Sequence, residues 1–169
     1  MKRLSHVDGS WGELLSQWTR QCHDLDEDFE NYLPETMRLL GSLVELTEGQ
    51  RWDGVFAHEE AGQYEGICFV NGAFIPGYSG RVLRVRHVLL SPKNDFGEYD
   101  EEHFARLLGT IFERILLLSE ALIPCQHLKF HFRSPADVAL FQKFSPILAK
   151  SDHFASVHMK GAWLMLTRS

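Results

Sequence analysis

Basic side chains alternate along two stretches of the sequence, and this spacing predicts two β-strands that each have a basic face. Arg84 and Arg86 alternate with apolar residues in RVLRVRHVLL, and Lys129, His131 and Arg133 do so in HLKFHFR. Residues two apart on a strand share a face and lie about 7 Å apart, so one anion can contact both. Neighbouring strands would bring these groups together into a site for a small anionic ligand. The alternative is a solvated face whose arginines pair with the chain's surplus acids.

A histidine and a cysteine could in principle react, but their positions in the sequence predict that they pack in the core. His87 is the one titratable group of the first basic stretch that can act as a base near a substrate amine. Strict alternation places it with Leu83, Val85 and Leu89, which predicts a packed core histidine. Cys68 lies within an apolar run and is predicted to be a small buried hydrophobe. No G-x-S-x-G motif marks a nucleophilic serine.

Metal chemistry is not indicated by the nine histidines. His127 and His131 are about 13 Å apart on a strand, which is too far to chelate one ion. The three cysteines are far apart and none lies in a C-x-x-C motif, so reduced thiols and a cytoplasmic location are expected. No apolar stretch follows the N-terminal basic residues, so no secretory signal is expected.

The length and composition are typical of a single globular domain. The chain has 169 residues, of which 44% are hydrophobic and 24% charged. We predict a single domain over 1–169, with a helical part over 1–50 and a strand-rich part over 51–169. The formal net charge of −6 argues against a nucleic-acid partner, and no apolar run is long enough for a membrane span.

Helices are predicted over 10–48. Ser10, followed by Glu13 three residues later, predicts an N-cap with a capping box. A second helix is predicted near 25–33, and Pro34 suits the first position of a third.

The strand-rich part alternates strands with two helices. A hairpin is predicted through Ala61-Gly62-Gln63, and Asp100 and Ser134 are predicted to begin the helices over about 100–122 and 134–148. Strands are predicted over 81–90, 127–133, 154–159 and 162–167. We therefore predict an α/β (α+β) fold with a mixed, mostly antiparallel central sheet of six to seven strands flanked by helices.

This order of elements resembles the GNAT superfamily of acetyl-CoA-dependent N-acetyltransferases. The stretch RVLRVRHVLLSP looks like the family's central strand, and the helix from Asp100 looks like the one whose N-terminus faces the cofactor pyrophosphate. The stretch HLKFHFRSPADVALFQKFSPIL looks like the following strand, loop and helix. The resemblance covers roughly 51–169 and implies acetyl-CoA or another acyl-CoA as cofactor. It also implies that an initial strand near 2–7 and the helices over 10–48 form the family's variable N-terminal part.

The family's pyrophosphate loop, R/Q-x-x-G-x-G/A, is only partly present. Its nearest register here is Asn94-x-x-Gly97-x-Tyr99, which loses the leading Arg/Gln and the final small residue. The resemblance makes these three residues the cofactor-binding candidates, with Tyr99 also at the mouth of the ligand site. Five carboxylates lie in the stretch of eight residues from 95 to 102: Asp95, Glu98, Asp100, Glu101 and Glu102. We therefore expect acetyl-CoA to bind weakly or not at all.

The tyrosine that the family uses as general acid corresponds to Phe141, which has no proton to give. No catalytic residue can therefore be assigned from the sequence. Two hypotheses follow: an acyl-CoA-dependent N-acyltransferase with altered cofactor contacts, or a catalytically inactive GNAT-like module that binds a small anionic ligand or a protein partner.

Overall fold

The computed structural model describes residues 1–169 and contains one seven-stranded sheet in the order β1-β2-β3-β4-β5-β7-β6. All neighbouring strands are antiparallel except β4 and β5, which are parallel. The strands are β1 (Lys2–Arg3), β2 (Asp53–Glu60), β3 (Gln63–Phe74), β4 (Arg81–Leu90), β5 (His127–His131), β6 (Phe154–Lys160) and β7 (Trp163–Arg168). The predicted class, a mixed and mostly antiparallel sheet with flanking helices, is confirmed.

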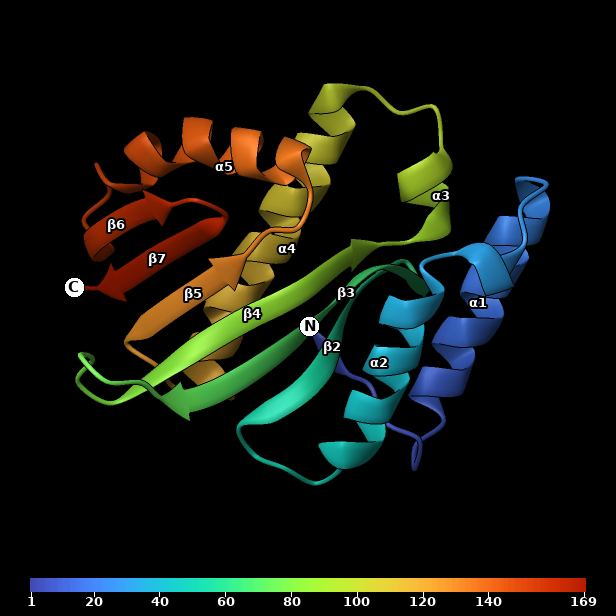
Figure 1. Cartoon of the computed structure of the whole chain (residues 1–169), viewed down its shortest axis with the longest axis horizontal. Helices are drawn as coiled ribbons and strands as arrows, with labels where there is room; N and C mark the ends of the chain where they lie inside the picture. Colours follow the sequence, from blue (N-terminus) through green and yellow to red (C-terminus); the bar gives the residue numbers. More distant parts are fainter.

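Helices cover both faces of the sheet, but they cover them unequally (Figure 1). They are α1 (Ser10–Asp24), α2 (Pro34–Leu46), α3 (Pro92–Phe96), α4 (Glu101–Ala121) and α5 (Pro135–Leu148). On one face α4 and α5 share a core with the apolar side chains of β3, β4, β5 and β7. On the other face α1 and α2 pack on β2 and β3. None of the helices has the length and apolar character needed to span a membrane.

Several predicted helix and turn signals have the expected geometry. The Asp100 carboxylate accepts a hydrogen bond from the His103 N–H at 2.8 Å, and Ser134 accepts one from the Ala136 N–H at 3.1 Å. Pro34 occupies the first turn of α2. Ala61 and Gly62 both have positive φ, at 49° and 77°, which suits a tight two-residue hairpin between β2 and β3.

The N-terminal part departs from prediction in three places. Ser10 is already helical and follows Gly9, and its Oγ accepts a hydrogen bond from the Ser5 N–H at 2.9 Å instead of capping the helix. The helix predicted near 25–33 is reduced to a 3₁₀ turn, Phe29–Asn31. Left-handed backbone at Asp26 and Leu33 flanks that turn and prevents a longer helix. The initial strand ends at Arg3.

A β-bulge in β4 overturns the prediction that His87 is a packed core histidine. Arg86 pairs with Phe69 and Leu89 pairs with Ile67, so two residues of β4 face the single residue Cys68 of β3. His87 has a φ of 51° and is only half-buried. The extra residue breaks the alternation of β4. Leu83 and Val85 therefore pack toward α4, whereas Leu89 packs toward α1 and α2.

Beyond the bulge, β4 and β5 separate. They pair only from Val82 to Val85 on β4, opposite His127 to Phe130 on β5. After this point β4 pairs with β3 alone, and β5 pairs with β7 alone. The last residues of β4 thus present a strand edge that has no β5 partner.

Candidate functional site

A cavity of about 370 Å³ occupies the space where β4 and β5 separate. Its size falls within the range of small-molecule sites. The lining comes from the α1–α2 connection, the start of α2, the end of β4, α3, α4, the β5–α5 connection and the start of α5. The lining residues are Tyr32, Leu33, Thr36, Val88, Leu89, Leu90, Asp95, Phe104, Leu108, Arg133, Ser134 and Asp137.

Two hydrogen bonds fix the walls of this cavity. The Tyr32 hydroxyl donates to the Leu90 carbonyl at 2.7 Å, which joins the α1–α2 connection to the end of β4. The Arg133 guanidinium donates to the Thr36 hydroxyl at 3.0 Å, which joins the end of β5 to α2. Burial raises the pKa of Tyr32 above its ordinary value, so its hydroxyl stays protonated as a donor. Side chains from the α1–α2 connection, from α2 and from the segment after β5 therefore bound the opening between β4 and β5.

Asp137 is the most perturbed acid in the cavity. Its residue is 9% exposed, in the first turn of α5. Burial raises the pKa of Asp137 from 3.8 to about 6, the negative charge of Asp95 adds to this, and a hydrogen bond from the Ser134 backbone opposes it. Near neutral pH such a carboxyl can accept or donate a proton. A capping role at the helix start is the competing structural explanation, because acids are common in first turns.

The sequence did not single out Asp137, because an acid in the first turn of a helix is ordinary. Its polar character inside PADVALFQKF was the available signal, since the apolar residues around it repeat at helical spacing. Tyr32 and Asp95 were missed as cavity residues because their placement depends on how the α1–α2 connection folds over β4.

The predicted basic strand face exists, although its members divide between two groups. Arg84 pairs with Lys129 across the parallel strands, and both point away from the core that contains Leu83 and Phe130. The Arg84 guanidinium donates to the Asn71 side chain on β3. This contact holds Arg84 toward β3 and away from the cavity.

The second group lies at the separating strand ends. Burial first, and then the charges of Arg86 and Arg133, lower the pKa of His131. Burial and the charges of Arg133, Arg86 and His131 lower the pKa of His87. The positive charges of this second group therefore disfavour protonation of its two histidines. The group consists of Arg86, His87, His131 and Arg133, and Arg133 also lines the cavity. Arg86 and Lys129 lie over the Trp163 ring, at 5.9 and 5.4 Å.

The three residues that the resemblance assigns to the cofactor already have partners in the protein. The Asn94 side chain is buried, donates to Ser91 Oγ at 2.9 Å and contacts His103 Nε2 at 2.9 Å through its oxygen. The Gly97 N–H donates to the Lys93 carbonyl at 3.0 Å, and the Tyr99 N–H donates to the Gly97 carbonyl at 2.9 Å.

Glycine at position 97 is explained by close packing. A Cβ at this position would lie 2.2 Å from the Lys93 carbonyl oxygen and 2.6 Å from the Tyr99 ring. Tyr99 is 42% exposed and stacks on His103 at 4.0 Å. In this conformation Gly97 and Tyr99 supply no free N–H to a cofactor phosphate. The acids beside them, Glu98, Asp100, Glu101 and Glu102, are exposed.

Phe141 lies in the apolar core beneath the cavity. It is 4% exposed, and its ring stacks on Phe132 with centroids 4.3 Å apart. The position cannot donate a proton. Cys68 is fully buried as predicted, and burial raises the pKa of its thiol to about 12. No group of three or more histidine, cysteine or acidic residues is arranged to hold a metal ion.

Comparisons with known proteins leave the family open. No protein-family model matches the sequence, and no curated protein matches it. Among solved structures, a GNAT-family protein from Desulfovibrio desulfuricans shares 13% sequence identity, with 92% of this chain and 94% of that chain covered and a TM-score of 0.43. The fold is defined by the strand order and pairing given above.

Proposed function

We propose that this chain is an N-acyltransferase that binds its acyl thioester through the pantetheine arm, with altered contacts to the rest of the cofactor. The observation that carries the proposal is the cavity at the separating ends of β4 and β5. It combines a strand edge that has no β5 partner, and of which Tyr32 occupies the Leu90 carbonyl, with a carboxyl whose pKa is about 6. An extended, amide-containing chain can hydrogen-bond to an open strand edge as an added strand does.

The chemistry of such a site follows from its residues. An acyl thioester would supply the acyl group, and an amine nitrogen forms the amide bond as the C–S bond breaks. The proton that the amine loses can pass to the Asp137 carboxylate, which is ionised above about pH 6. The thiolate takes its proton from water, because Phe141 has none to give.

A catalytically inactive ligand-binding module is the second candidate. The engaged N–H groups of Gly97 and Tyr99 and the buried Phe141 favour it, because each removes a feature that the acyltransferase family uses. The two candidates differ in whether an acyl thioester binds at the strand edge. Comparing donors with and without phosphates tests this directly.

We expect S-acetylpantetheine to bind about as tightly as acetyl-CoA, within roughly threefold, because the loop adds no attraction for phosphate. We also expect acetyl-CoA to bind more weakly than micromolar. The double variant Glu98→Gln/Glu102→Gln should tighten acetyl-CoA by about thirtyfold, since each of the two removed charges relieves about 1 kcal/mol of repulsion. The same variant should leave S-acetylpantetheine unchanged. Isothermal titration calorimetry at physiological salt measures all four affinities.

Two outcomes would contradict this proposal. A hundredfold loss of affinity for S-acetylpantetheine would show that the phosphates are gripped, which the loop geometry does not support. Failure of both donors to bind, at millimolar concentration, would remove the acyltransferase and leave the ligand-binding module. Mass spectrometry of an amine panel with S-acetylpantetheine then decides whether transfer occurs.

A further inference from the structure

Acidic residues are absent from four adjacent strands of this acidic protein. The chain contains 23 aspartates and glutamates, yet β4, β5, β6 and β7 contain none. The same strands carry arginines, lysines and histidines along the face that α1 and α2 leave uncovered, which is turned toward the viewer in Figure 1. These residues are Arg84, Arg86, Lys129, His131, His158 and Lys160. Strand pairing places His158 beside Met165 and Lys160 beside Trp163, so the cations extend across the sheet.

Carboxylates of the chain offset little of the positive charge on this face: Asp53 acts on Arg84, but neither Arg84 nor Arg86 forms an ion pair. Among the residues of β4, β5, β6 and β7, only Arg168 forms an ion pair, and its partner is Glu120 on α4. The prediction that surplus acids pair with the strand arginines is therefore wrong for Arg84 and Arg86. Arg86 has an aromatic neighbour in place of a carboxylate. A cationic face with few counter-charges favours an anionic ligand from outside.

The strongest convergence of cations adjoins the cavity. Arg86 and His131 both contact the Trp163 ring, at 5.9 and 4.5 Å, and Arg133, two residues after His131, forms part of the cavity wall. The charges of Arg86 and Arg133 both lower the pKa of His131, after burial. Asp137 lines the same cavity. One site therefore presents a cationic patch at its edge and a buried carboxyl inside. A ligand that carries charges of both signs complements this arrangement.

We propose that the acceptor is a small amine that also carries a phosphate or carboxylate, with its anionic group on Arg86, His131 and Arg133 and its amine directed to Asp137. This assignment of substrate class rests on the proposed acyl transfer, but the binding it describes needs no acyl donor. Arginine grips phosphate and carboxylate oxygens with paired, charge-assisted hydrogen bonds. The amine meets the one cavity acid that is buried, where an ion pair is least screened.

Binding of O-phosphoethanolamine tests the proposal without any acyl donor. Calorimetry should show it to bind at least tenfold more tightly than ethyl phosphate or ethanolamine, each of which has only one of the two groups. β-Alanine has a carboxylate in place of the phosphate, so comparing its affinity with that of O-phosphoethanolamine shows which anionic group the site prefers. Arg86→Gln and Arg133→Gln should each weaken O-phosphoethanolamine about tenfold, consistent with loss of a charge-assisted contact. Asp137→Asn should weaken O-phosphoethanolamine but leave ethyl phosphate unchanged.

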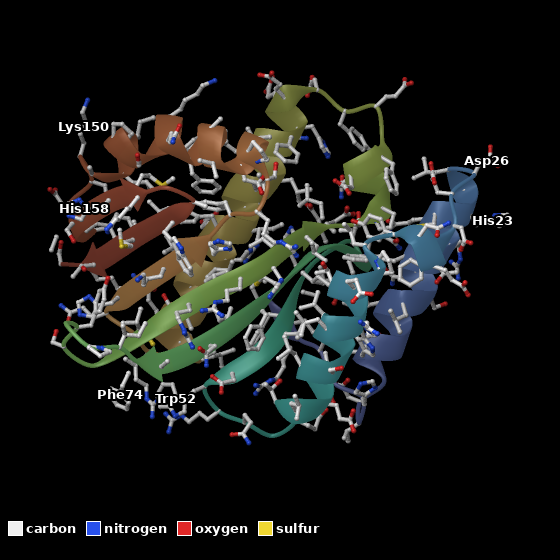
Figure 2. All side chains as sticks on the ribbon, in the orientation of Figure 1. His23, Asp26, Trp52, Phe74, Lys150 and His158 are labelled. Carbon is white, nitrogen blue, oxygen red and sulfur yellow. The ribbon has the colours of Figure 1, made fainter.

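Lys150→Gln is the matched control. It removes one positive charge from an exposed residue beyond the C-terminal end of α5, at the opposite end of that helix from Asp137. Lys150 is labelled in Figure 2. It should leave O-phosphoethanolamine affinity unchanged, and thermal unfolding confirms that each variant is folded. Equal affinity for O-phosphoethanolamine and ethyl phosphate, or indifference to both arginine variants, would overturn the proposal.

The inference and the proposed function can fail separately. O-phosphoethanolamine binding that depends on Arg86, Arg133 and Asp137 without measurable acyl transfer would remove the acyltransferase and retain the ligand site. Transfer to amines that lack an anionic group, unaffected by Arg86→Gln, would retain the acyltransferase and remove the proposed substrate class.

Discussion

Asp137→Asn is expected to lower the rate of acyl transfer by about 10²- to 10⁴-fold, which is the usual contribution of a positioned general base. The wild-type rate should rise with pH through an apparent pKa near 6, because only the ionised carboxyl accepts the proton from the amine. The variant should lose this titration. Single-turnover transfer from S-acetylpantetheine, measured between pH 5 and 8, gives both the rate and its pH profile.

A merely structural role for Asp137 predicts a different result. If the carboxyl only caps α5, the Asn side chain retains most of that function, and the pH profile of any transfer remains unchanged. Asp137→Glu provides a conservative comparison, since it retains the acid but moves it by one methylene. Recovery of the pH profile in this variant supports a proton-transfer role, whereas an unchanged profile in Asp137→Asn contradicts it.

The same carboxyl has a consequence for stability that does not depend on catalysis. In the folded protein the pKa of Asp137 is raised to about 6, so the folded state holds its proton more tightly than the unfolded state. The free energy of unfolding should therefore fall as pH rises from about 4 to 6, by on the order of 1–2 kcal/mol after allowance for solvent screening. Asp137→Asn should lack this component. Urea unfolding of both proteins at pH 4.5 and 7 checks the difference.

Alternation predicted the faces of the central strand, and capping residues predicted where two helices begin. Arg84, Leu83 and Val85 lie on the faces that a period of two assigns to them, and Asp100 and Ser134 begin their helices as expected. These features depend on contacts within a few residues, so a local pattern suffices to predict them.

The candidate site was less predictable because it depends on departures from regularity. The bulge at His87 has no marker in RVLRVRHVLL, since a histidine with positive φ is uncommon and the strand pattern continues on both sides. The bulge nevertheless decides which residues of β4 face the cavity. Asp137 becomes a cavity residue because α5 begins where β5 leaves β4, which is a tertiary relation that the pattern of α5 alone does not contain.

Helix α1 contributes to the site indirectly, by fixing the α1–α2 connection that carries Tyr32. The Trp18 side chain is fully buried, and its indole N–H donates to the Tyr64 carbonyl of β3 at 2.9 Å. The Trp18 ring also makes an edge contact with Tyr32 at 6.0 Å, and Tyr32 is bonded to the end of β4. Loss of the indole therefore removes both the hydrogen bond to β3 and the ring contact with Tyr32, which lines the cavity.

Trp18→Ala is expected to lower the free energy of unfolding by about 3–5 kcal/mol, because a large side chain is removed from a closed core and the space does not fully collapse. The midpoint of thermal unfolding should fall on the order of 10 °C for a chain of this size. Trp18→Phe retains a ring but loses the donor to Tyr64, so a smaller loss of about 1–2 kcal/mol is expected. Leu46→Ala, at a residue that is 73% exposed, should change stability by no more than about 0.5 kcal/mol. Calorimetry and urea unfolding measure all three, and equal effects for Trp18→Ala and Leu46→Ala would show that α1 does not anchor the cavity wall.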